Sequence, residues 1–150
     1  SEREIERAVA LLIEIEKTVA EGAGAAGLAA VLSDPQRFQG RKVGLVLTGG
    51  NIDTRLLASV LTRELAREGR LSELCIDLAD KPGQLARLAT LVGDAGANII
   101  EVVHQRVFTD LPAKGTLLRM VIETRDRAHL EDTLKRIRAA GFSAEITSSQ

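Results

Sequence analysis

The chain has 150 residues, 45% of them hydrophobic, and its 20 basic and 21 acidic side chains give a formal net charge of -1. This length and composition suffice to bury a core in one domain or in two small ones. The balanced charge argues against a polyanion partner, and the absence of Trp and Tyr removes the aromatic platforms on which single-stranded nucleic acids stack. We therefore expect no nucleic-acid partner.

Cysteine content and hydropathy indicate where the protein works. The single Cys75 excludes an internal disulfide and favours a reducing compartment. No apolar run reaches membrane-spanning length, and the amino-terminal stretch is charged and amphipathic rather than like a signal peptide. We expect a cytoplasmic location and no membrane partner. Because the sequence starts with Ser1 rather than Met, we also expect it to be part of a longer protein.

The first elements are predicted to be helices. Apolar residues keep helical spacing from Glu2 to Ala20 among solvated charges, which predicts a long amphipathic helix. Residues 22–32 are rich in Ala and Gly and predict a closely packed second helix, broken at Asp34-Pro35. A further helix over residues 54–68, capped by Asp53, ends at Gly69.

One strand is predicted among these helices. The run Val43–Leu47 is almost wholly apolar, as in a strand buried on both faces. Such a strand needs parallel neighbours, and no other strand is predicted before Leu74. We therefore expect residues 1–69 to be a mainly helical α-α-β-α remnant of a larger α/β domain. Their apolar stripes should pack against another copy or exchange elements between chains.

The second half begins with a strand, a helix and a strand. A strand covers Leu74 to Leu78, and Asp80 is placed to cap a helix whose first turn contains Pro82. Gly96 can supply the left-handed residue that ends this helix. An apolar strand then runs from Asn98 to Val107.

A similar set of elements follows. Residues 109–114 predict a hairpin loop and residues 116–124 a strand; Asp126 caps a helix that ends at Gly141, and residues 142–147 form a last strand. The order β-α-β-β-α-β over residues 70–150 is the ferredoxin-like arrangement of an α+β fold. One face of its antiparallel sheet is expected to stay open, so we expect self-association through that sheet.

The remaining motifs do not predict a nucleotide site, a metal site or a catalytic site. The pattern Gly22-x-Gly24-x-x-Gly27 fits a dinucleotide-binding expression but follows a helix, so these glycines are better explained by close packing. His104 and His129 lack the neighbours that metal ligation requires, which favours structural or surface roles. No metal site and no catalytic residue are therefore predicted.

Both halves of the sequence resemble known protein families. Asp80-Lys81-Pro82-Gly83-Gln84-Leu85, together with Gly96-Ala97-Asn98-Ile99, resembles the ACT domain, a small regulatory module that binds amino acids. The first half resembles the carboxyl-terminal end of the catalytic domain of fold-type II, pyridoxal-phosphate-dependent threonine dehydratases (threonine ammonia-lyases) through residues 21–30 and 43–53. Residues 98–106 are also similar to the ACT domain of short, catabolic-type members.

This resemblance implies a cofactor in the parent enzyme. Thr48 matches the position that faces the pyridine nitrogen of pyridoxal phosphate, and Gly49 and Gly50 match residues close to its ring. The family's Schiff-base lysine and phosphate loop lie earlier in the catalytic domain, and no such motifs occur here. We expect these 150 residues to bind no cofactor and to be inactive alone, while the parent is a lyase.

The resemblance also implies an effector site. The amino end of a helix offers free N–H groups to a carboxylate, and Asp80 or Asn98 could accept hydrogen bonds from an ammonium group. The candidate effector-binding residues are Asp80, Lys81, Pro82, Gly83, Gln84, Leu85, Ala97, Asn98 and Ile99. Isoleucine, valine, threonine or serine are the expected effectors, bound where two ACT domains meet. Two alternatives stay open: Asp80 merely caps the helix, or the domain is a dimerisation module without a ligand.

Overall fold

The computed structural model describes residues 1–79, 81–105 and 115–147. It divides the chain into two compact units, Ser1–Glu64 and Leu65–Gln150, each with its own hydrophobic core. The boundary falls inside helix α4, Thr54–Arg67. None of the helices in the described ranges has the length and apolar composition that a bilayer crossing requires.

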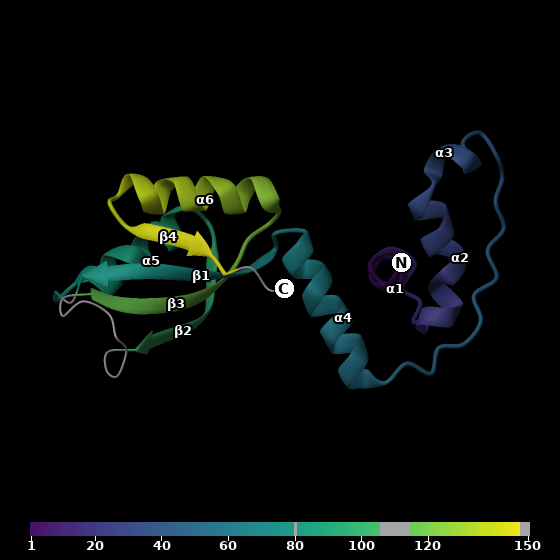
Figure 1. Cartoon of the computed structure of the whole chain (residues 1–150), viewed down its shortest axis with the longest axis horizontal. Helices are drawn as coiled ribbons and strands as arrows, with labels where there is room; N and C mark the ends of the chain where they lie inside the picture. The colour runs from purple at the N-terminus through teal and green to yellow at the C-terminus, as the bar shows by residue number, and fades with distance from the viewer. Residues whose placement is uncertain (80, 106–114, 148–150) are drawn as a thin grey trace. The chain divides into compact units, whose positions relative to one another are not determined.

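The second unit is a sheet of four antiparallel strands with two helices. Its elements in chain order are β1 Leu71–Ala79, α5 Gln84–Asp94, β2 Asn98–Gln105, β3 Gly115–Glu123, α6 Arg127–Ala139 and β4 Ser143–Ile146. The strands lie in the order β2-β3-β1-β4, which Figure 1 shows. The predicted β-α-β-β-α-β order and the α+β ferredoxin-like fold are confirmed.

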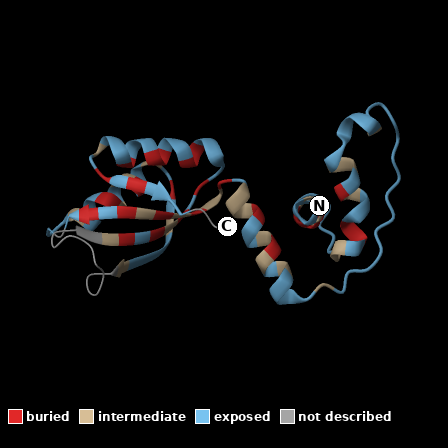
Figure 2. Ribbon diagram, in the orientation of Figure 1, coloured by how far each residue is buried: buried red, intermediate tan, exposed pale blue. Residues whose placement is uncertain are grey.

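The core of this unit lies between one sheet face and both helices. Along β1, buried and less buried residues alternate, and Figure 2 shows this alternation. Leu74 pairs with Met120 and Ile76 with Leu118, so the inward side chains of the two central strands stack on one face. Each fully buried aliphatic side chain stabilises the fold by roughly 1.5–3 kcal/mol. The two helices complete this core with Leu88, Val92, Leu130, Leu134 and Ile137.

Several predicted helix ends are confirmed. Asp126 caps α6 by accepting a hydrogen bond from the His129 N–H at 2.8 Å. Gly96 and Gly141 follow α5 and α6 with φ values of 80° and 91°, the left-handed conformation that favours glycine. Local sequence signals therefore suffice to end these helices.

The predicted start of α5 is wrong. The helix begins at Gln84, and its N-cap is Gly83 with a φ of 83°, without a side-chain cap. The Lys81 N–H bonds to the Ala79 carbonyl at 2.7 Å, so Pro82 lies in a tight turn rather than in the first helical turn. Asp80, the predicted cap, lies outside the described residues, as does the predicted 109–114 hairpin loop.

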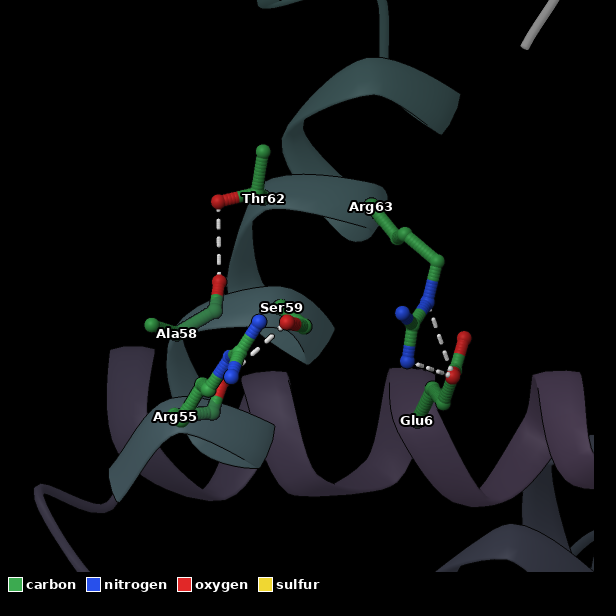
Figure 3. A network of polar contacts seen from close by, with 6 residues as sticks. All are labelled: Glu6, Arg55, Ala58, Ser59, Thr62 and Arg63. Carbon is green, nitrogen blue, oxygen red and sulfur yellow. Dashed lines mark hydrogen bonds and ion pairs between the residues drawn. The ribbon is translucent and has the colours of Figure 1, made fainter. Parts of the chain in front are cut away.

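The first unit packs helices without a sheet. Its elements are α1 Glu2–Glu14, α2 Gly22–Ser33, the short α3 Pro35–Phe38 and the first turns of α4. Small and branched side chains of α1, α2, α4 and the connection between α1 and α2 form its core: Ala8, Val9, Leu12, Ala20, Ala25, Ala29 and Val60. Arg63 of α4 donates to the buried Glu6 carboxylate of α1 through Nε at 3.0 Å and Nη2 at 2.5 Å, as Figure 3 shows. As predicted, Asp53 caps α4 by accepting from the Leu56 N–H at 2.9 Å.

The first helix is shorter than its periodicity predicts. It ends at Glu14 rather than near Ala20, because Lys17 adopts a left-handed conformation with a φ of 56°. The Lys17 ammonium donates to the Glu14 carbonyl at 2.6 Å and so satisfies a carbonyl of the last turn. Ala20, which follows this turn, lies in the core at 1% exposure.

The predicted strand Val43–Leu47 does not form. Residues 41–53 have no regular secondary structure, and Val46 is 80% exposed; Figure 2 shows this connection mostly in the colour of exposed residues. All of residues 1–64 are described and contain no strand, so the backbone of this run has no ladder to join. The α-α-β-α prediction for the remnant is therefore corrected to helices joined by an extended segment.

His129 provides a test of how the second unit is held together. Its Nδ1 accepts from the Arg125 N–H at 3.1 Å and its Nε2 donates to the Ala95 carbonyl at 2.8 Å, which joins the start of α6 to the end of α5. We predict that His129→Ala lowers the free energy of unfolding by about 2–3 kcal/mol, because both backbone groups lose their partner. Urea unfolding followed by circular dichroism measures this.

The matched control is Glu131→Ala, an exposed position on the same helix. It should change stability by no more than about 0.5 kcal/mol. Equal stability of the two variants would contradict the structural role of His129.

Candidate effector site

The first part of the candidate site is the turn that leads into α5. Lys81, Pro82, Gly83 and Leu85 are exposed and Gln84 is half-buried. Because α5 starts without a side-chain cap, the N–H groups of its first turn leave a partial positive charge at its amino end. This end of the helix is therefore suited to an anionic group.

The second part of the site is the start of β2. Ala97 is buried, and its N–H bonds to the Val92 carbonyl at 3.1 Å. Asn98 is exposed, and its Nδ2 donates to the Glu123 carboxylate of β3 at 3.4 Å. Ile99 is half-buried opposite Ile122. The sequence did not predict Glu123 as a site residue, because only the register of the sheet shows that it lies opposite Asn98.

The structure does not bring the two parts together within one chain. Asn98 and Leu71 both pair with Glu123, so Asn98 lies at the end of the sheet where β1 begins. The α5 turn follows Ala79, at the other end of β1. Nine residues of strand separate these ends, a length of about 26 Å at roughly 3.3 Å per residue. One amino acid can contact both parts only if they come from different copies.

The predicted cofactor residues pack against the chain itself. Thr48, Gly49 and Gly50 are exposed, and the Glu21 N–H donates to the Gly49 carbonyl at 3.2 Å. A Cβ at Gly24 would collide with the Thr48 carbonyl, and one at Gly49 would lie 2.5 Å from a Glu21 carboxylate oxygen. The predicted close helix packing of the α2 glycines is confirmed at Gly22, where a Cβ would lie 3.3 Å from a methyl group of Ile5 in α1. At Gly24 the close neighbour is instead the non-helical segment at Thr48.

Comparison with known proteins identifies the second unit. Residues 72–142 match the family model of the ACT domain, and this range contains β1, α5, β2, β3 and α6. Residues 72–142 are an ACT domain. A solved ACT domain, from the GTP pyrophosphokinase of Chlorobium tepidum, covers 51% of this chain and 96% of its own at 16% identity, with a TM-score of 0.41.

The similarity to curated relatives extends beyond the ACT domain. The L-threonine ammonia-lyase of Thermotoga maritima is 36% identical over 146 residues, which are 97% of this chain and 36% of that protein. The L-threonine ammonia-lyase of Geobacter sulfurreducens is 37% identical over 145 residues, with the same shares. The chain thus spans about a third of the length of these relatives, and both of its units are similar to them.

The predicted cofactor segment has an acidic neighbour. Glu21 places a carboxylate beside Gly49, where a phosphorylated cofactor would bring further negative charge. Thr48, Gly49 and Gly50 are exposed. Within the described residues, no group of three or more His, Cys, Asp or Glu side chains could hold a metal ion.

The face of the ACT sheet opposite α5 and α6 carries polar side chains around a thiol. Arg119 bonds to Glu73 at 2.6 Å on this face, and Cys75 lies opposite Arg119 and Glu145 on the neighbouring strands. Burial raises the pKa of the Cys75 thiol, and the nearby Asp77 carboxylate raises it further. The half-buried thiol is therefore a slow nucleophile. Its rate of alkylation reports on the groups that surround it on this face.

Gly24 tests the packing of the cofactor segment. We predict that Gly24→Ala lowers the free energy of unfolding of the first unit by about 1–3 kcal/mol, because the added methyl group meets the Thr48 backbone. Circular dichroism in increasing urea measures the change. Gly44→Ala is the control, since a Cβ there meets no atom within 4 Å. If Gly24→Ala and Gly44→Ala unfold at the same urea concentration, the close contact at Gly24 is not part of the native state.

Asp77 tests the electrostatics of the open face. Removing its carboxylate should lower the pKa of Cys75, so at a fixed pH below that pKa more thiolate is present. We predict that Asp77→Asn speeds alkylation by iodoacetamide roughly twofold and moves the pH–rate profile to lower pH. Asp94→Asn, at the end of α5, should leave the profile unchanged. An unchanged profile in Asp77→Asn would exclude the proposed interaction.

Proposed function

We propose that this chain is the regulatory carboxyl-terminal region of a threonine ammonia-lyase, and that its ACT domain binds a free amino acid and modulates the parent enzyme. The parent would convert L-threonine to 2-oxobutyrate and ammonia with pyridoxal phosphate. The observation that carries the proposal is the 36% sequence identity to a protein of that name over 97% of the chain, a range that includes the ACT domain. Thr48, Gly49 and Gly50 would border the cofactor only in the intact parent.

The geometry of the ACT domain supports an amino acid as the ligand. A carboxylate suits the uncapped start of α5, and the amide of Asn98 can accept from an ammonium group. Since the two parts lie at opposite ends of one sheet, we propose that two copies complete the site. The proposed effectors are isoleucine, valine, threonine and serine.

A purely structural function is the second candidate. The outer strand β2 exposes apolar side chains, with Ile100 at 55%, Val102 at 39% and Val103 at 37%. An exposed apolar edge strand favours pairing with another chain, which would bury these residues without any ligand. In that case the ACT domain drives self-association and binds no ligand.

The cellular setting belongs to the same proposal. A regulator of amino-acid breakdown would act in the cytoplasm, and the single half-buried thiol of Cys75 agrees with a reducing compartment. We propose no catalytic residue within these 150 residues.

Calorimetry separates the two candidates. We predict that titration of the chain with L-isoleucine, L-valine, L-threonine and L-serine gives heat with at least one of them, and none with its D-enantiomer. Asn98→Ala should weaken that binding about tenfold or more, because a hydrogen bond to a charged group is lost. Asn51→Ala, an exposed asparagine in the first unit, is the control and should bind normally.

Two negative results together would exclude effector binding. If none of the four amino acids releases heat, and none changes the mass measured by light scattering, effector binding is excluded and only the structural function stands.

A further inference from the structure

A pocket opens at the end of the ACT sheet where β2 begins and β3 ends. Its volume is about 530 Å³. The lining residues come from three separate parts of the sequence: Arg70, Gly96, Asn98, Glu123, Thr124 and Arg125. Apart from Asn98, none of them belongs to the effector site that the sequence predicts.

Backbone contacts hold the wall of this pocket in place. Arg70 lies between α4 and β1, and its carbonyl accepts from the Thr124 N–H at 2.9 Å. The buried Thr124 hydroxyl donates to the Gly69 carbonyl. The next residue, Arg125, donates its N–H to the imidazole of His129 at 3.1 Å. The charged residues therefore stand on a fixed framework rather than on a loose loop.

The charges of the pocket match those of a zwitterion. Arg70 and Arg125 bring positive charge and Glu123 brings negative charge to one hollow. Asn98 Nδ2 donates to one oxygen of the Glu123 carboxylate, which leaves the other oxygen and the Asn98 amide oxygen as acceptors. Phosphate or another purely anionic group would meet repulsion from Glu123, whereas an α-amino acid brings both signs of charge.

We propose that this pocket binds the charged groups of a free α-amino acid. Its carboxylate bonds to Arg125 and Arg70, and its ammonium group bonds to Glu123 and the amide oxygen of Asn98. This inference rests on the proposed function and deepens it, because it assigns recognition of the amino acid's charged end to residues of one chain. In this assignment Arg125 and Arg70 bind the carboxylate in place of the start of α5. The α5 turn of a second copy then contacts only the side chain of the ligand.

The location of Arg70 gives the ligand a route to the rest of the chain. Arg70 follows α4 directly, and its guanidinium also bonds to Glu68 at 3.3 Å. Arg127 of α6 holds the end of the same helix by donating to the Arg67 carbonyl at 2.6 Å. A ligand that draws Arg70 toward its carboxylate therefore acts on the segment that leads back into the first unit.

Nuclear magnetic resonance on the full 150-residue chain tests the pocket. We expect added L-isoleucine, L-valine, L-threonine or L-serine to shift the backbone signals of Gly96, Asn98, Thr124 and Arg125. For the amino acid that binds, the matching amine without a carboxylate and the matching acid without an ammonium group should each bind at least tenfold more weakly. Inorganic phosphate should leave the four signals in place.

Variants show whether the arginines act by charge. Arg125→Gln should raise the dissociation constant at least tenfold, and Arg125→Lys should restore part of the affinity. Arg136→Gln is the matched control, because Arg136 pairs with Asp132 on the exposed face of α6, 2.8 Å away, and does not line the pocket. Arg125 is exposed, so its variants are expected to fold, which circular dichroism verifies.

The outcomes separate this inference from the proposed function. If an amino acid binds but shifts only residues 81–85, or binds Arg125→Gln as tightly as the unchanged chain, the pocket inference is wrong and the proposed function stands. If an amino acid binds in the pocket but leaves a longer protein carrying this chain with unchanged activity, the proposed regulation is wrong and the pocket inference stands. Binding of no amino acid overturns both.

Discussion

Burial of one face of a four-stranded antiparallel sheet beneath α5 and α6 is the constraint on which the second unit depends. The pairing of β1 with β3 sets Leu74 and Ile76 against Met120 and Leu118. A shift by one residue would turn these side chains to the open face, so the core fixes the register. The same register places Asn98 beside Glu123 and sends the α5 turn to the far end. The locations of Asn98 and of the α5 turn follow from this packing.

Much of this fold can be predicted from local patterns. Alternating apolar residues mark β1, and Asp126 and Gly141 mark the ends of α6, because capping and left-handed glycines depend on neighbours in sequence. Other features are not marked by such patterns. Lys17 adopts the left-handed conformation after α1 although it is neither Gly nor Asn, so residue type alone does not predict the end of this helix.

The Val43–Leu47 run shows a different limit of sequence analysis. Its apolar composition predicts a strand buried on both faces, but composition describes a preferred environment and cannot supply the neighbouring strands. In the structure the run is extended and exposed. This mismatch supports the proposal that the first unit belongs to a larger α/β domain.

The pocket could not have been predicted from the sequence. Arg70, Asn98 and Arg125 are far apart along the chain, and only the sheet register and the turn after β3 bring them to one hollow. The one residue that the sequence did indicate, Asn98, was found through its resemblance to a family motif. The resemblance therefore located part of the site, and the fold supplies its charged partners.

The central claim is that the ACT unit binds an amino acid through its own residues while the first unit does not. Differential scanning calorimetry with and without the effector tests it most directly. We predict two unfolding transitions, and the effector should raise the transition temperature of the ACT unit alone. At ten times the dissociation constant the gain is about 1.4 kcal/mol, or roughly 5–10 °C for a domain of this size. A transition temperature that no amino acid changes, or a rise confined to the first unit, would contradict the account.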